Sequence, residues 1–429
     1  MDETSLRAQL ELAVSAEPPI GHLVGNSLRA GRRLRRRRRV QAAGGAALAV
    51  ALLAVALPAA HGALSPSRGL ASPAARTPML YVATSADTVV PVDVRTDKAF
   101  APIKLGNTSM TVCMAITSDG KTIYVASFDG HVTPISTATR TASHPILVPR
   151  YHPGQIALAP DGRLAYVVGD VGGFVPVDLV TGAVGKAVRD RSIERLVMAP
   201  GGRTAYGFTG GATRTMFPVD LATDTPLKPV TFPRLVLQFT VAPDGKSAWV
   251  FLGGTPKTGE LVQVNLTTWA TSAPIKLPDG VDQVAFGPRD ATAYAFGGDE
   301  VTPIDLARGA LSTPIKVSVP ATESPGGFAL SPDGRTGIVY NFVPSRGTEI
   351  VSVNLANGTA LRPVYLGNKQ WAPVQVTFAP GTSTAYLGVV NQTPGERLGK
   401  LIPVAAATGK PDGRPVNLGG QPYQILVTR

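Results

Sequence analysis

The sequence has little of what metal and redox sites are usually built from, with one cysteine and five histidines in 429 residues. A single cysteine forms neither an intramolecular disulfide nor a thiolate metal centre. Aromatic residues make up only 6% of the chain. No basic stripe with interleaved aromatics follows residue 40, so nucleic-acid binding is not expected. The GxSxG, P-loop and HExxH motifs are also missing. We therefore expect no cofactor, no metal and no nucleic-acid partner.

The N-terminal 60 residues have the pattern of a membrane signal. Seven arginines lie between Arg32 and Arg39, and residues 40–60 carry no charge. A helix of that length measures about 31 Å and could cross a bilayer, with the arginine flank in the cytoplasm. We expect a cytoplasmic tail over 1–39, a transmembrane helix over 40–60, a Ser/Pro/Ala-rich linker over 61–78 and an extracytoplasmic domain over 79–429. The alternative is a signal peptide cleaved near residue 60, leaving a secreted domain.

Glycine (46) and proline (38) are abundant, and from Met79 onward they punctuate a repeat. Each unit has a short apolar strand, a tight turn such as Asp161-Gly162, and a second strand with an aromatic residue. That position recurs every 40 to 48 residues, at Tyr81, Tyr124, Tyr166, Tyr206, Trp249, Tyr294, Ile338 and Tyr386. A third strand (FVPVDL in the clearest unit) and a fourth (APIKL) follow. Prolines in these outer strands suit an edge position.

Four strands in about 44 residues is the size of a propeller blade. Counting each strand type predicts an all-β, eight-bladed β-propeller of four-stranded blades. The chain enters at a second strand and ends on a lone first strand at Gln424 to Val427. That last strand would complete the first blade, which closes the ring and removes an exposed sheet edge. The alternative is a seven-bladed ring with one unit outside.

The repeat, as in IALAPDGRLAYVVGDVGGFVPVDLVTG at residues 156–182, resembles the YVTN β-propeller family. The resemblance covers residues 79–429. It implies a propeller fold and, for most members, an extracytoplasmic location. The family includes surface-layer-type and lactonase-like proteins, so the resemblance does not select one activity.

One polar position opens each innermost strand. It holds Cys113, Gln155, Arg195, Gln238, Gln283, Gly327, Gln375 and Gln424. In a propeller these residues form a ring at one mouth of the central channel, here called the collar. Each glutamine amide either bonds the backbone of a neighbouring blade or helps to bind water or a polar, uncharged ligand. We take Gln155, Arg195, Gln238, Gln283, Gln375 and Gln424 as binding candidates, together with Trp371. An exposed Trp371 on a loop would be a contact anchor; a Trp371 packed over the blade would be structural.

Other polar residues predict structure rather than chemistry. His131 and His152 should share a face, but without carboxylates they make a poor zinc site. Cys113 has no histidine nearby in sequence to act as a base. The third-strand residues Asp93, Asp178, Asp220 and Asp305 recur in register, which is typical of turn caps.

Taken together, these features predict a membrane-anchored, extracytoplasmic propeller that acts as a non-enzymatic binding or scaffold module for a protein or a cell-envelope polymer. The alternative is a lactonase-like hydrolase, which would need carboxylates or histidines converging at one channel mouth. The identity of the partner and the oligomeric state do not follow from the sequence.

Overall fold

The computed structural model describes residues 78–106, 111–149, 151–170, 172–210, 213–254, 258–288, 291–317, 326–393 and 395–428. The predicted tail, transmembrane helix and linker lie outside these residues, apart from residue 78. Within the described ranges, no helix is long and apolar enough to span a membrane.

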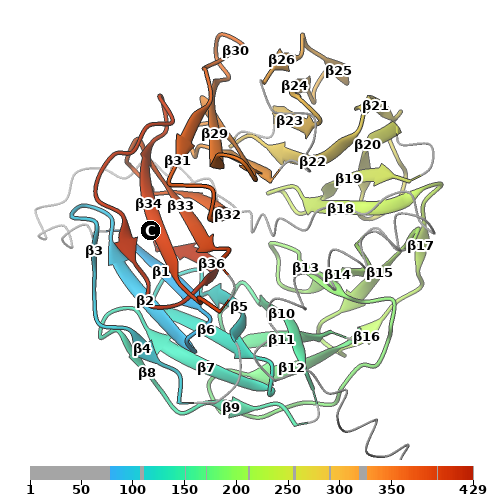
Figure 1. The fold of residues 1–429 in the computed structure, drawn as a ribbon. Coiled ribbons are helices and arrows are strands. Elements are labelled where there is room, and N and C mark those ends of the chain that lie inside the picture. The colour runs from blue at the N-terminus through green and yellow to red at the C-terminus, as the bar shows by residue number, and fades with distance from the viewer. Residues whose placement is uncertain are drawn as a thin grey trace, which may run out of the picture.

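Eight antiparallel sheets stand around a common axis as the blades of a closed propeller (Figure 1). The eight-bladed prediction is confirmed, and the seven-bladed alternative is wrong. We number the blades from the one that holds the first strand of the chain. Their innermost strands, from blade 1 to blade 8, are β36 (Pro422–Val427), β5 (Thr111–Ile116), β10 (Pro153–Leu158), β13 (Arg195–Met198), β18 (Leu235–Val241), β22 (Val281–Phe286), β27 (Gly327–Leu330) and β32 (Trp371–Phe378).

The second and third strands form the body of each blade. The second strands are β1 (Met79–Thr84), β6 (Thr122–Ser127), β11 (Leu164–Gly169), β14 (Thr204–Phe208), β19 (Ser247–Gly253), β23 (Thr292–Gly297), β28 (Thr336–Val343) and β33 (Thr384–Asn391). The third strands are β2 (Thr88–Asp93), β7 (His131–Ser136), β12 (Phe174–Asp178), β15 (Thr215–Asp220), β20 (Thr258–Asn265), β24 (Glu300–Asp305), β29 (Gly347–Asn354) and β34 (Gly399–Ala405).

The fourth strand differs from the prediction because most blades carry it in short or separate pieces. These pieces are β3 (Lys98–Ala99), β4 (Ile103–Lys104), β8 (Thr141–Ala142), β9 (Ile146–Leu147), β16 (Thr225–Pro226), β17 (Val230–Thr231), β21 (Ile275–Asp279), β25 (Ala310–Leu311), β26 (Ile315–Lys316), β30 (Thr359–Ala360), β31 (Val364–Leu366) and β35 (Val416–Asn417). Blade 3 has only isolated bridges at this position, such as Phe174 to Val188.

A proline in the third strand explains the break. Six blades place proline at the same register position, and its carbonyl accepts one bond from the outer segment, as Pro91 O does from Phe100 N at 2.9 Å. Proline has no N–H to return a second bond, so the outer strand leaves the ladder there. Blade 5 has Gln263 instead, and its N–H is satisfied by the Ser272 hydroxyl at 3.0 Å.

Strand β36 pairs with β1 and closes the ring, as predicted. The pairing runs from Leu80 with Val427 to Thr84 with Pro422. Hydrogen bonds at both ends fasten it, since Thr428 N donates to Met79 O and Ser85 N donates to Gln421 O. Figure 1 shows the two strands side by side although they lie at opposite ends of the propeller sequence.

The core is divided among the blade interfaces. The described residues form eight buried apolar clusters, and each cluster joins two adjacent blades. In β1, Leu80 and Val82 pack toward blade 8, whereas Tyr81 and Ala83 pack toward blade 2. This alternation follows from the two-residue period of a strand and makes every blade apolar on both faces.

Candidate functional site

The collar consists of inter-blade hydrogen bonds in which five glutamine amides each exchange bonds with the next blade. In every case the partner is the residue that follows the collar position there. The pairs are Gln155 with Leu196, Gln238 with Val284, Gln283 with Phe328, Gln375 with Ile425, and Gln424 with Met114. The amide nitrogen donates to the backbone carbonyl, and the amide oxygen accepts from the backbone N–H.

This arrangement gives the glutamines the structural role that the sequence analysis held open. A primary amide matches a backbone N–H and C=O in one plane, so each glutamine satisfies two groups that adjacent blades could not otherwise pair. The ligand-binding role that the sequence also suggested for them stays a prediction. It would depend on the second N–H of each amide, which Gln375 already directs to Thr377 Oγ1 at 3.1 Å.

The other three collar positions depart from glutamine in different ways. The Cys113 sulfur accepts a bond from the Ile156 backbone, and burial, only partly offset by that bond, raises the pKa of the thiol to about 12. Gly327 leaves space for Tyr340, since a Cβ at Gly327 would lie 2.6 Å from the Tyr340 hydroxyl oxygen. Arg195 forms no hydrogen bond or ion pair with any described residue.

A second set of inter-blade bonds uses the repeated aromatic residue of the second strands. Tyr386 of blade 8 donates to Val94 O at 2.9 Å and Asp97 Oδ1 at 2.7 Å in blade 1. Tyr81 of blade 1 donates to Thr137 O of blade 2 at 3.1 Å, and Tyr166 bonds Asp224 of the next blade. Burial is the main reason that the pKa of Tyr386 lies well above its ordinary value. The aromatic repeat in the sequence is therefore largely a repeat of blade-to-blade contacts.

The recurrent third-strand aspartates cap turns, as predicted. Asp178 Oδ1 accepts from the backbone N–H groups of Val180 and Thr181, both at 2.9 Å. Asp305 Oδ1 bonds Ala307 N and Arg308 N in the same way. These bonds lower the pKa of both carboxyl groups. Asp93 and Asp220 make equivalent bonds.

Two roles were left open for Trp371, an exposed contact anchor or a residue packed over the blade, and the structure contradicts the first. Trp371 opens β32 and is only 9% exposed. Its ring packs with Tyr340, Ile350 and Leu366 in the apolar cluster between blades 7 and 8, and Lys400 Nζ lies 4.4 Å from the ring centroid. The structure places Trp371 as core, which was the alternative role.

The histidines do not assemble a metal site in the described part of the chain. His131 Nδ1 lies 3.1 Å from Asp129 Oδ2. The His152 ring stacks on Phe128 and contacts Phe128 O through Nδ1 at 2.8 Å. Among the described residues, no three His, Cys, Asp or Glu side chains are placed to hold a metal ion.

A buried polar group that the sequence analysis missed lies in blade 7. Glu349 is 1% exposed, and its Oε1 accepts from the Tyr365 hydroxyl at 2.9 Å. That hydroxyl in turn accepts from Arg346 Nη1 at 3.1 Å. Glu349 Oε2 and the neighbouring Asn341 Nδ2 are buried without a partner in the described structure. Burial raises the pKa of Glu349 despite the opposing effects of Tyr365 and Arg346. Other blades have Thr88, His131 or Glu300 at the position of Glu349. Because the residue type varies from blade to blade, the repeat pattern did not predict a special role for Glu349.

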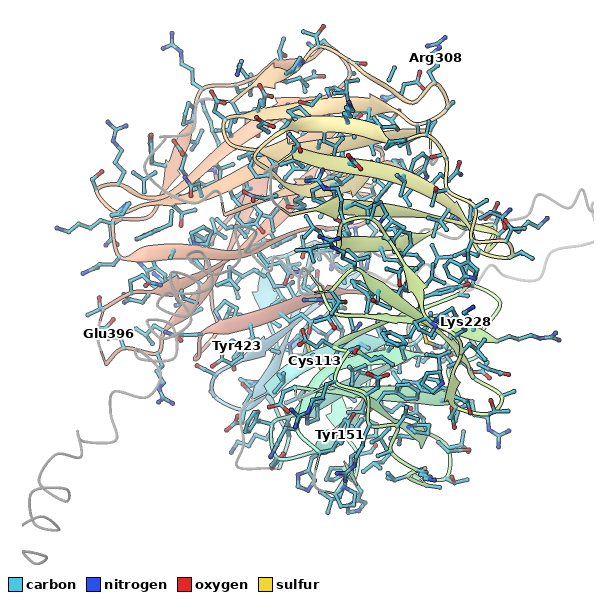
Figure 2. All side chains as sticks on the ribbon, turned by 90° about the vertical axis from the view of Figure 1, so that its right-hand side faces the viewer. Cys113, Tyr151, Lys228, Arg308, Glu396 and Tyr423 are labelled. Atoms are coloured by element: carbon cyan, nitrogen blue, oxygen red, sulfur yellow. The ribbon has the colours of Figure 1, made fainter. Side chains whose placement is uncertain are left out.

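The two faces of the ring differ in what they present. The loops before the first strands and the hairpins between second and third strands lie on the side of the collar, here called the collar face. Figure 2 views the ring from its edge, with Glu396 and Tyr423 toward this face and Arg308 toward the other. A shallow, open depression on the opposite face is lined by Thr292, Asp305, Arg308 and Ser312 of blade 6.

Comparisons with known proteins identify the fold. No protein-family model and no curated protein matches the sequence. Many solved structures are similar, among them the following three. The dihydro-heme d1 dehydrogenase NirN in complex with DHE has a TM-score of 0.65 at 16% identity, covering 81% of this chain and 74% of that chain. The C-terminal WD40 domain of Sif2 has a TM-score of 0.57 at 11% identity, covering 73% and 90%. The β-propeller domain of Myceliophteria thermophila Cps50 (Swd1) has a TM-score of 0.51 at 12% identity, covering 67% and 95%. At such low identity the likeness is one of fold alone, that of a β-propeller.

Proposed function

We propose that this chain is a membrane-anchored, extracytoplasmic propeller of the YVTN type that acts as a non-enzymatic binding module for a protein or a cell-envelope polymer. The anchor rests on the sequence of residues 1–60, where an arginine run precedes an uncharged segment. The binding role rests on one surface of the propeller.

That surface is a cationic strip on the collar face of blades 7 and 8, formed by Arg346, Tyr365, Lys369, Gln370 and Arg397. The Arg346, Lys369 and Arg397 side chains are exposed and form no ion pair with a described residue. The Arg346 guanidinium lies 5.0 Å from the Tyr365 ring centroid and donates to its hydroxyl. An arginine stacked in this way is held ready for bidentate contact with carboxylate or phosphate groups.

Two acidic groups near the strip are already engaged, and a third, Asp87 of blade 1, interacts with Arg397 without forming an ion pair. Glu349 is buried and bonded to Tyr365, and the Glu396 carboxylate accepts from the Asn391 amide. The strip is also continuous, because Gln392 N donates to Gln370 O at 2.6 Å and joins the two loops of blade 8. This exposed strip, in which Arg346, Lys369 and Arg397 form no ion pair with a described residue, is the observation that carries the proposal. It favours a partner with negative charge.

The collar itself offers little acid–base chemistry. Glutamine amides position groups but do not take up a proton at neutral pH. The described residues of the collar therefore favour binding over the lactonase-like hydrolysis that the family resemblance also allows.

Two experiments test the two parts of the proposal. The first asks whether the full chain stays in the membrane fraction after alkaline carbonate extraction, and whether external protease reaches the propeller in intact cells. A variant lacking residues 40–60 should be released from the membrane. A full chain that is extracted like a soluble protein and is not cleaved near its N-terminus would contradict the anchor.

The second experiment compares two triple variants in retention by isolated cell envelopes and in chemical cross-linking on intact cells. Arg346→Gln, Lys369→Gln and Arg397→Gln together should reduce both readouts. The matched control on the opposite face, Arg203→Gln, Lys246→Gln and Arg335→Gln, removes the same charge and should change neither. Equal effects of the two triples would show a general charge effect and contradict a site on the strip.

A further inference from the structure

Arg195 is the one charged side chain among the eight collar positions. It lies in β13, directly before Leu196, whose backbone exchanges two hydrogen bonds with Gln155 of the preceding blade. Its place in the ring is therefore fixed as firmly as that of the glutamines. What differs is the bond that it should make to the following blade.

A glutamine at position 195 would be expected to bond the backbone of Phe239, which follows Gln238 in blade 5. Every collar glutamine in the structure bonds the corresponding residue of its neighbour. Arginine has donors only and cannot reproduce this exchange. The pair of collar hydrogen bonds that joins other adjacent blades is therefore missing between blades 4 and 5.

Aromatic packing holds that interface instead. Tyr206 and Phe239 have ring centroids 5.1 Å apart, and Phe208 and Phe239 lie at 6.2 Å. These rings belong to an apolar cluster of buried residues that includes Met216 and Phe232. Because the interface has this other support, the residue at position 195 is free to serve a purpose other than joining blades.

The Arg195 side chain is partly buried. The neighbouring Glu194 carboxylate interacts favourably with it, but the two form no ion pair. The Arg195 stem runs beside Gly210, where a Cβ would lie 3.1 Å from the Arg195 Nε, so a glycine there leaves room for the guanidinium. No carboxylate of the described residues lies within 4.0 Å of it. A partly desolvated cation without a hydrogen-bonding partner is costly unless a ligand supplies one.

One neighbouring collar group also presents a donor. In Gln155 of blade 3 one amide N–H and the oxygen are used by the next blade. The residue two positions along its strand, where Gln375 finds the Thr377 hydroxyl, is Ala157. The second N–H of the Gln155 amide therefore meets no side-chain acceptor at that position.

We propose that the Arg195 guanidinium is the receptor for an oxyanion, either inorganic phosphate or sulfate or the carboxylate of a small organic acid, at the inner edge of the collar. A planar guanidinium binds such oxygens through two parallel hydrogen bonds, which are stronger than bonds between neutral groups. The site is separate from the cationic strip and does not depend on the membrane anchor or on a macromolecular partner.

The test measures anion binding to the purified full chain by isothermal titration calorimetry, at constant ionic strength in chloride. Phosphate and sulfate form one arm, and acetate and citrate form the other, which separates inorganic anions from organic acids. At least one anion should bind saturably. Arg195→Gln should weaken that binding by about tenfold or more, whereas Lys246→Gln, which removes an exposed cation on the opposite face, should leave it unchanged.

Thermal unfolding provides the second readout, because Arg195→Gln restores the residue that five other blades use. Its Tm in chloride should equal or exceed that of the wild type. Arg195→Lys, which retains the charge without the planar fork, should bind the anion with intermediate affinity. Equal anion binding by wild type and Arg195→Gln, no binding of any of the four anions, or a lower Tm of Arg195→Gln in chloride would overturn the proposal.

Discussion

Gln424 and Met114 exchange two hydrogen bonds across 310 residues of sequence. Gln424 Nε2 donates to Met114 O at 3.1 Å, and Met114 N donates to Gln424 Oε1 at 2.6 Å. Gln424 lies on the strand that closes blade 1, so this pair joins the closing strand to blade 2. It completes the same contact that four other glutamines make around the ring.

Gln424→Ala should therefore destabilise the propeller. The substitution removes two hydrogen bonds and leaves the N–H and C=O of Met114, a residue that is 1% exposed, without partners. We expect a loss of about 2–4 kcal/mol in the free energy of unfolding, measured by urea denaturation. Gln424→Glu should also be destabilising, since it removes the donor and buries a charge. Gln392→Ala, on the exposed end of blade 8, is the control. A Gln424→Ala variant as stable as this control would contradict a stabilising role of the collar hydrogen bonds.

Much of the ring could be predicted from the repeat, and the reasons for the failures are local. The positions of Gln155 and Gln424 were evident because five blades share the residue, but the partner of each amide depends on how the blades stand side by side. The role of Trp371 stayed open because its burial involves Tyr340 and Ile350 of the adjacent blade. Glu349 could not be found, because its environment is specific to one blade and no spacing marks it. Interfaces between repeats are formed by residues about 40 positions apart. The pattern within one repeat therefore does not predict which residues meet.

Gly327→Ala should be destabilising although the change is only one methyl group. The new Cβ would lie 2.6 Å from the Tyr340 hydroxyl oxygen and 2.8 Å from Cζ, and the Tyr340 ring is held in the core. Overpacking of this kind costs about 1–3 kcal/mol. Gly201→Ala, where no atom would lie within 4 Å of the Cβ, should be close to neutral.

A double variant separates this clash from a loss of backbone freedom. Tyr340→Phe removes the atom nearest to the new Cβ, so Gly327→Ala should cost less in the Tyr340→Phe background. Thermal denaturation of the four proteins gives the coupling between the two sites. Additive effects would show that Tyr340 does not fill the space of the missing collar side chain.

Gln263→Pro should be tolerated or mildly stabilising, in contrast to most proline substitutions in a strand. Six other blades have proline at this register position, and the Gln263 N–H bonds only the Ser272 hydroxyl. Proline there would reduce the freedom of the unfolded chain and stabilise by about 0.4–1 kcal/mol. Val262→Pro is the contrasting variant, because alternate residues of a strand bond opposite neighbours and the Val262 N–H should face β19. We expect Val262→Pro to lose about 3 kcal/mol or more. Similar Tm values for the two variants would contradict this account of the repeated proline.

Glu349→Gln should raise stability at neutral pH. Burial raises the pKa of Glu349 above its ordinary value of 4.5, so the folded state binds a proton more readily than the unfolded state. The contribution of the neutral carboxyl group to the free energy of unfolding is fully present below pH 4.5. It declines as the pH rises through the pKa of the folded state. Glutamine stays neutral throughout, and its oxygen can still accept from the Tyr365 hydroxyl. The difference in Tm between Glu349→Gln and wild type should therefore be largest near pH 7 and shrink toward pH 4. A Tm difference that is independent of pH, or a Glu349→Gln variant less stable than wild type at pH 7, would show that the carboxylate is stabilised by a partner and not strained by burial.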